Sequence, residues 1–83
     1  MNRFELSNYV ISKNYTKEEI KNVLEKIDKK IEFLQKKFNN KYDKIEIVNA
    51  IIKNEKTLII KMFFILYLQN LLSLNFEDLE EVI

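Results

Sequence analysis

The chain has 83 residues, a length that fits a single domain, 1–83. Its formal net charge of +1 lacks the strongly basic signature of a nucleic-acid-binding protein. It contains no Cys, His, Gly or Pro, so disulfides, thiolate or imidazole metal ligands and glycine-rich phosphate loops are excluded. Because hairpin turns rely on such residues, we expect an all-α fold. The predicted architecture is a small four-helix bundle, with two long and two short helices, around a central apolar helix at 58–74.

Charge is distributed unevenly along the chain. Residues 1–41 carry ten Lys or Arg against six Asp or Glu, a net +4, whereas residues 42–83 carry four against seven, a net −3. The last seven residues hold four acids and no base. This asymmetry predicts either self-association or a charged partner.

The first element, at residues 3–12, is ambiguous. Phe4, Asn8 and Ile11 recur at helical spacing, whereas the stretch "RFELS" alternates like a strand. With no pairing partner for a strand in view, we expect a helix and keep the strand as the alternative.

The clearest predicted element is a helix at 16–38. Thr16 and Glu19 form a capping box at its start, and Asn39 with Asn40 supplies a left-handed stop after its end. Apolar residues recur between these signals at alternating spacings of four and three, as in a bundle seam. They are Ile20, Leu24, Ile27, Ile31, Leu34 and Phe38.

The spacing of apolar residues along the seam resumes in the same register after "NNKYD", which leaves three interpretations of the next segment. We favour a break followed by a second helix at about 43–54, started by Asp43. One bent, continuous helix remains possible, and a short strand at "IEIVNAII" is a minor alternative.

The segment 58–74 is apolar on every side. Its longest unbroken apolar run is only Met62 to Leu68, too short for a membrane span, so we expect a buried central helix. Short partner helices would leave part of it uncovered, which predicts a homodimer or a protein partner on this helix. Gln69 and Asn70 need hydrogen-bond partners if buried, or mark an exposed edge or a polar contact between chains. Asn75 then caps a last short helix, with Asp78 in its first turn.

Residues suited to catalysis are scarce. Without His or Cys the commonest general base and the best nucleophile are missing, and the adjacent pairs Glu18/Glu19 and Glu80/Glu81 point in different directions on a helix. We therefore expect no enzyme, no cofactor and no metal.

Phe33 is the one aromatic residue that combines with a charge cluster. It lies far from the seam on a helical wheel, among lysines three or four positions away. We favour a covered position, with residues 3–12 over the ring and the lysine stems around it. The alternatives are an anchor for an acidic protein groove and stacking on a nucleic-acid base. The candidate partner-binding residues are Phe33, Lys26, Lys29, Lys30, Lys36 and Lys37.

A second candidate surface is the acidic end of the chain, formed by Glu77, Asp78, Glu80 and Glu81. We favour a solvated helix face for it. The alternative is an intermolecular partner for the lysine face, either head to tail or across a dimer axis.

The order of elements resembles the N-terminal core-binding domain of tyrosine recombinases. The stretch "YVISKNYTKEEIKNVLEKIDKKIEFL" is similar to its first half, and "EKTLIIKMFFILYLQNLL" occupies the place of its last helix. The resemblance implies DNA contacts from that helix, but Lys61 is the only base within Leu58–Leu74. We do not assign the chain to that family.

The favoured function is therefore a non-enzymatic, cytoplasmic protein that occupies a partner's surface, as an inhibitor, an antitoxin, an immunity protein or a regulator of a phage or mobile element. A nucleic-acid-binding module using the lysines of helix 16–38 and a structural homo-oligomeric subunit are the alternatives. The cytoplasmic expectation rests on the lack of Cys and on a start, "MNRFELSNYV", without the apolar core of a signal peptide.

Overall fold

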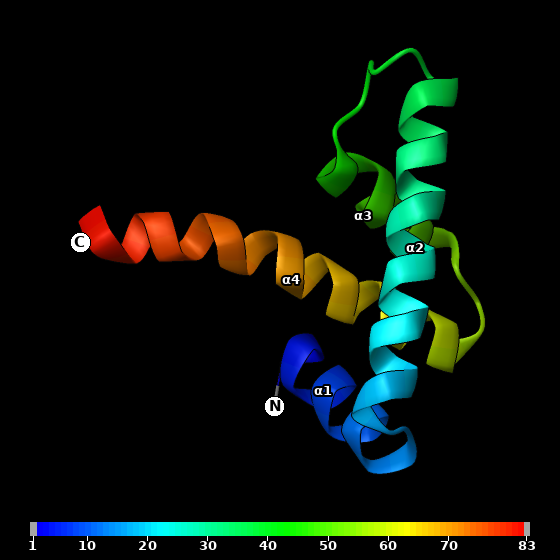
Figure 1. Cartoon of the computed structure of the whole chain (residues 1–83), viewed down its shortest axis with the longest axis vertical. Helices are drawn as coiled ribbons and strands as arrows, with labels where there is room; N and C mark the ends of the chain where they lie inside the picture. The colour runs from blue at the N-terminus through cyan, green and yellow to red at the C-terminus, as the bar shows by residue number, and fades with distance from the viewer. Residues whose placement is uncertain (1, 83) are drawn as a thin grey trace.

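The computed structural model describes the backbone of residues 2–82 and the side chains of residues 2–73. Four helices follow one another, α1 (Arg3–Asn14), α2 (Lys17–Lys37), α3 (Lys44–Asn54) and α4 (Leu58–Val82), and the described residues contain no strand (Figure 1). The all-α prediction, with two long and two short helices, is confirmed. The strand alternatives for 3–12 and for the start of 43–54 are wrong.

Capping side chains set the ends of the middle helices, as the sequence predicts. The side chains of Thr16 and Asp43 each accept a hydrogen bond from the backbone N–H three residues on, and the Glu carboxylate at that position accepts one from the backbone N–H of the cap residue. Asn39 and Asn40 adopt φ of 56° and 59°, in the left-handed region that Asn tolerates best after Gly. The break between α2 and α3 is therefore real.

The predicted last helix, separated at Asn75, is wrong, because the backbone of α4 continues without interruption to Val82. The physical reason is the cost of starting a new helix. An interior Asn costs at most ~0.7 kcal/mol relative to Ala. A new helix must fix several residues before its first hydrogen bond forms. No Gly or Pro near Asn75 forces the break.

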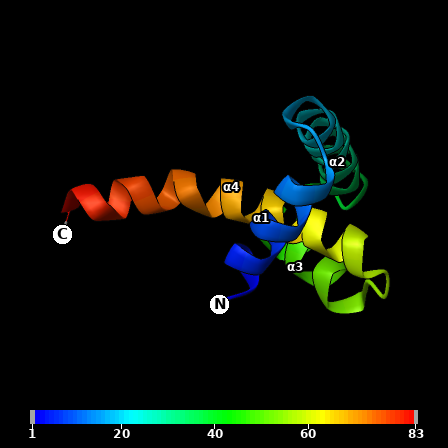
Figure 2. The ribbon, with the colours of Figure 1, turned by 90° about the horizontal axis from the view of Figure 1, so that it is seen from below.

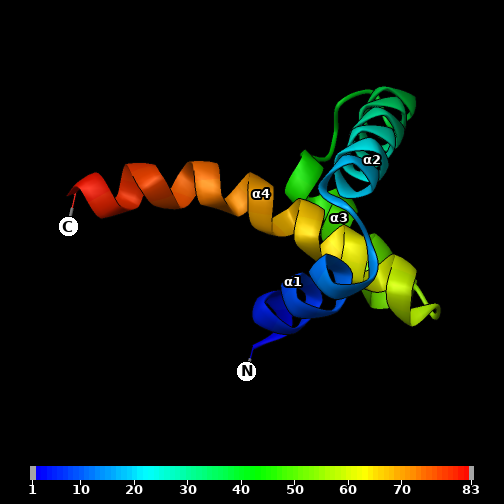
Figure 3. The ribbon, with the colours of Figure 1, turned by 60° about the horizontal axis from the view of Figure 1, so that its bottom comes forward.

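The core lies around the first half of α4. Every side chain from Met62 to Leu68 is buried, and α1, α2 and α3 surround this stretch (Figures 2 and 3). The core completes itself with residues from the three other helices, among them Ile11, Ile31 and Val48, which have no exposed surface. The other three helices therefore suffice to cover this stretch, and it needs no second molecule.

The rest of α4 differs from its core half. At its start Leu58 is 65% exposed, and beyond the core the ribbon runs outward from the other three helices to the C-terminus (Figures 1 and 2). Half-buried Gln69 accepts a hydrogen bond of 2.5 Å from the Asn8 side chain of α1, whereas Asn70 is exposed. These two polar residues follow Leu68, the last fully buried residue of α4 among the described side chains. Among the described residues, no helix combines the length and apolar character needed to cross a membrane.

Candidate partner-binding surface

The opposite sides of α2 have different roles. Ile27 and Ile31 are buried in the core, whereas Phe33 is 64% exposed. The expected cover by residues 3–12 is wrong: α1 lies beside the N-terminal end of α2, and Phe33 belongs to the C-terminal half (Figure 1). The reason is that α1 buries Ser7 and Ile11 in the core and bonds to Gln69, which directs it toward α4.

The lysines around Phe33 are exposed without exception. Every ion pair among the described side chains involves Lys44, so none of these lysines is neutralised there. Because the residues are separated by helical spacings, one rigid helix presents them together. We call this set the Phe33 surface: Phe33, Lys26, Lys29, Lys30, Lys36 and Lys37.

An exposed phenylalanine ring leaves binding energy available. Full burial of such a side chain is worth about 1.5–3 kcal/mol relative to exposure. A molecule that covered Phe33 would gain much of that amount, because the ring is 64% exposed before binding. Lysine stems could add apolar contact while their ammonium groups stayed in water.

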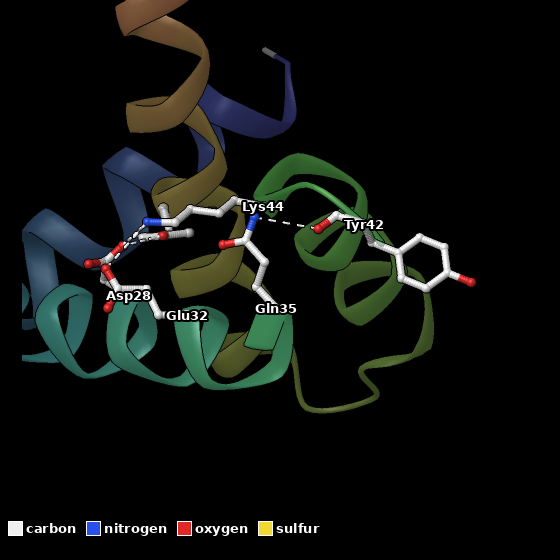
Figure 4. Close-up of polar contacts among 6 residues, drawn as sticks. Asp28, Glu32, Gln35, Tyr42 and Lys44 are labelled. Atoms are coloured by element: carbon white, nitrogen blue, oxygen red, sulfur yellow. Dashed lines mark hydrogen bonds and ion pairs between the residues drawn. The ribbon is translucent and has the colours of Figure 1, made fainter. Parts of the chain in front are cut away.

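A polar network fixes α2 against α3 and α4. Lys44 Nζ of α3 lies 3.3 Å from Asp28 Oδ1 and 3.5 Å from Glu32 Oε1, both on α2 (Figure 4). The buried Tyr67 of α4 donates its hydroxyl to the same Asp28 oxygen over 2.5 Å. The network therefore orients α2, and with it the Phe33 surface. Sequence reasoning missed it, because no local spacing links residues 28, 44 and 67.

The protonation states of this network are set by its own contacts. The hydrogen bond from Tyr67, aided by Lys44, holds the pKa of Asp28 below its usual value despite partial burial. Burial, and then the hydrogen bond and charge of Asp28, raise the pKa of Tyr67 well above its usual value. At neutral pH Asp28 is therefore a carboxylate and Tyr67 a neutral donor, which suits a structural contact.

A groove between α2 and α3 was also not predicted from the sequence. Phe38, predicted as a seam residue, is 46% exposed, and its ring meets Tyr42 edge to face with centroids 5.8 Å apart. The reason is position: Phe38 caps the end of α2, beyond the reach of the core. The groove has a volume of about 490 Å³ and is lined by Leu34, Phe38, Tyr42, Glu46, Ile47, Ala50 and Ile51.

The second candidate surface predicted from the sequence is the acidic end of the chain. The acidic residues Glu77, Asp78, Glu80 and Glu81 fall outside the described side chains. Among the described residues, no three His, Cys, Asp or Glu side chains gather in an arrangement that could hold a metal ion. Comparison with family models, curated proteins and solved structures finds no match to this chain.

Proposed function

We propose that this chain is a non-enzymatic, cytoplasmic binding protein that acts by occupying the surface of a partner protein through the Phe33 surface. Inhibitors, antitoxins, immunity proteins and regulators of phages or mobile elements act in this way. The partner chemistry that fits is an acidic groove with an apolar pocket. The pocket takes the ring of Phe33, and carboxylates at its rim meet the surrounding lysines.

The observation that carries the proposal is the exposed ring of Phe33 among five exposed lysines that pair with none of the described acids. Burial cannot explain it, because the ring is 64% exposed. The helix beneath it is held by Ile27, Ile31 and the Asp28 network. Interface hot spots are typically large side chains that fill a desolvated pocket near the centre of the contact, inside a polar rim.

A protein partner is favoured over nucleic acid by the chemistry of the cations. Arginine reads phosphates and bases with its planar fork, whereas lysine is a point charge. The single arginine, Arg3, lies on α1 with its guanidinium carbon 5.0 Å from the ring centroid of Phe4. The Phe33 surface itself offers only one aromatic ring for stacking.

The test begins with a pull-down from the native host followed by mass spectrometry, and then measures the affinity of the recovered protein by calorimetry. Phe33→Ala should weaken binding at least ~10-fold, as loss of a central anchor does. Leu58→Ala is the matched control, since Leu58 is equally exposed but lies at the start of α4. It should leave affinity unchanged.

Two results would overturn the proposal. In the first, the recovered partner binds the Phe33→Ala variant as tightly as the original chain. In the second, the chain is retained on DNA or RNA in a salt-sensitive way, and Lys29→Glu with Lys36→Glu abolishes that retention. The second result would replace the protein partner with a nucleic acid.

A further inference from the structure

A second groove lies between the N-terminal half of α2 and the middle of α4, with a volume of about 570 Å³. Its apolar lining comes from Ile20, Leu24 and Tyr67, of which Ile20 and Leu24 are only half-buried. Lys17, Lys21 and Lys29 also line it. The groove therefore combines uncovered apolar surface with an excess of positive charge.

The acids in this groove do not cancel that excess. Asp28 lines it but is already bound by Lys44 and Tyr67, which leaves Glu25 as the other carboxylate. Lys17 and Lys21 are exposed and take part in no ion pair among the described side chains. An occupant with carboxylates and apolar side chains is the complementary chemistry.

The chain itself contains such a segment, in α4 beyond Asn70. Its sequence, "LLSLNFEDLEEVI", combines apolar residues with four acids and no base. Position 74 follows Asn70 by one helical turn, and positions 77 and 81 follow it by two and three. Leu74, Glu77 and Glu81 therefore occupy the same side of α4 as Asn70, which lines the groove.

This segment leads away from the groove of its own chain, since α4 runs outward as one helix (Figures 1 and 2). Its length nevertheless matches the groove. From Asn70 to Val82 the helix rises about 18 Å, and from Lys17 to Lys29 the groove wall on α2 also rises about 18 Å. A second copy, related by a two-fold axis near Asn70, could lay its segment along this wall.

We propose that the chain forms a reciprocal dimer in which residues 71–82 of α4 from each copy fill the α2–α4 groove of the other. Glu77 and Glu81 of one copy lie against Lys17 and Lys21 of its partner, and the apolar positions of the segment cover Ile20 and Leu24. The contact is isologous, so both grooves close at once. It is independent of Phe33, although Lys29 borders both surfaces.

The test uses charge reversal in the full-length chain, with mass measured by sedimentation at ~100 mM salt. The original chain should have twice its monomer mass of 10.1 kDa. Lys17→Glu with Lys21→Glu should weaken the dimer at least ~10-fold, because like charges then face each other across the contact. Glu77→Lys with Glu81→Lys should do the same. An equimolar mixture of the two variants should recover the dimer, since both contacts of the mixed pair are again complementary.

The controls separate this contact from nonspecific charge effects and from the Phe33 surface. Lys53→Glu with Lys56→Glu changes two exposed lysines outside the groove and should leave the dimer intact. Phe33→Ala should also leave it intact. A chain that stays monomeric up to ~1 mM, or variants whose mixture does not reassociate although each retains its helical circular dichroism, would overturn the proposal.

Discussion

At the residue scale, exposure separates two phenylalanines that composition alone cannot distinguish. Phe63 is buried on α4, and its ring meets Tyr15 edge to face with centroids 5.2 Å apart. Phe33 lies on the outer side of α2 and keeps most of its surface in water. Burial contributes to the free energy of unfolding only where the folded chain removes the side chain from water. The two residues should therefore respond differently to truncation.

We expect Phe33→Ala to change the free energy of unfolding by less than about 1 kcal/mol, because few contacts are lost at an exposed position. Phe63→Ala should lower it by about 3–5 kcal/mol, because the substitution leaves a cavity in the core. Urea denaturation of both variants measures the difference. Equal losses would mean that Phe33 is covered within its own chain.

Tyr67 gives the chain a specific sensitivity to alkaline pH. Its folded-state pKa is raised above its usual value of about 10, so its contribution to stability is complete below that pH and is lost as pH rises further. Tyr67→Phe should therefore lose less stability than the original chain between about pH 10 and 12. Urea midpoints over that range provide the measurement. Identical losses in both proteins would show that other groups cause the alkaline effect.

Asp28 predicts the opposite response on the acid side. Its folded-state pKa lies below its usual value of about 3.9, so its contribution is complete above that pH and is lost as pH falls. We expect Asp28→Asn to reduce the acid sensitivity of the unfolding midpoint between pH 5 and 2. Glu18→Gln is a suitable control, because Glu18 is exposed in the first turn of α2 and its side chain makes no ion pair among the described residues. A reduction as large in that control would argue against a specific role for Asp28.

At the element scale, helix ends follow local chemistry wherever a cap has no competitor. Thr16 and Asp43 start helices because each begins a capping box, and Asn39 with Asn40 ends α2 because both residues tolerate positive φ. Asn75 fails as a cap because α4 already runs through it. The same residue type thus ends one helix and lies inside another, depending on the backbone that precedes it.

Asn75→Ala tests that difference. In a continuous helix the substitution should raise helix content slightly, because Ala has the higher helix propensity. At an N-cap it would cost about 0.5–2 kcal/mol. Far-ultraviolet circular dichroism with amide exchange of residues 71–82 measures the effect, and Thr16→Ala supplies the response of a true cap. If Asn75→Ala lost exchange protection over residues 71–82, the result would instead support a separate terminal helix capped by Asn75.

At the scale of the whole molecule, three helices of limited length enclose seven consecutive core residues of the fourth, Met62–Leu68. Each of the three helices contacts α4, so we expect the fold to be cooperative. Ile11 on α1 illustrates the dependence, because it has no exposed surface and belongs to the same core cluster as α4. The loss of α1 packing should therefore destabilise every helix that contacts the core.

We expect Ile11→Ala to lower the free energy of unfolding by about 2–5 kcal/mol, the usual cost of such a cavity. Circular dichroism and tyrosine fluorescence should shift together in urea, as for a two-state domain. The exposed neighbour variant Ser12→Ala should barely change either signal. If α1 melted separately while the tyrosine signal held, the core would not be a single cooperative unit.

The sequence is enough to predict the class of fold, the starts of α2 and α3, and the stop at Asn39 and Asn40, because caps and helical spacing act over a few residues. It also located the lysines around Phe33 on one side of a helix. Packing between the helices leaves Phe33 uncovered and shields α4 within its own chain over Met62–Leu68. It also joined Asp28, Lys44 and Tyr67. Those outcomes depend on how helices pack against one another, and packing joins residues whose separation in sequence carries no local signal.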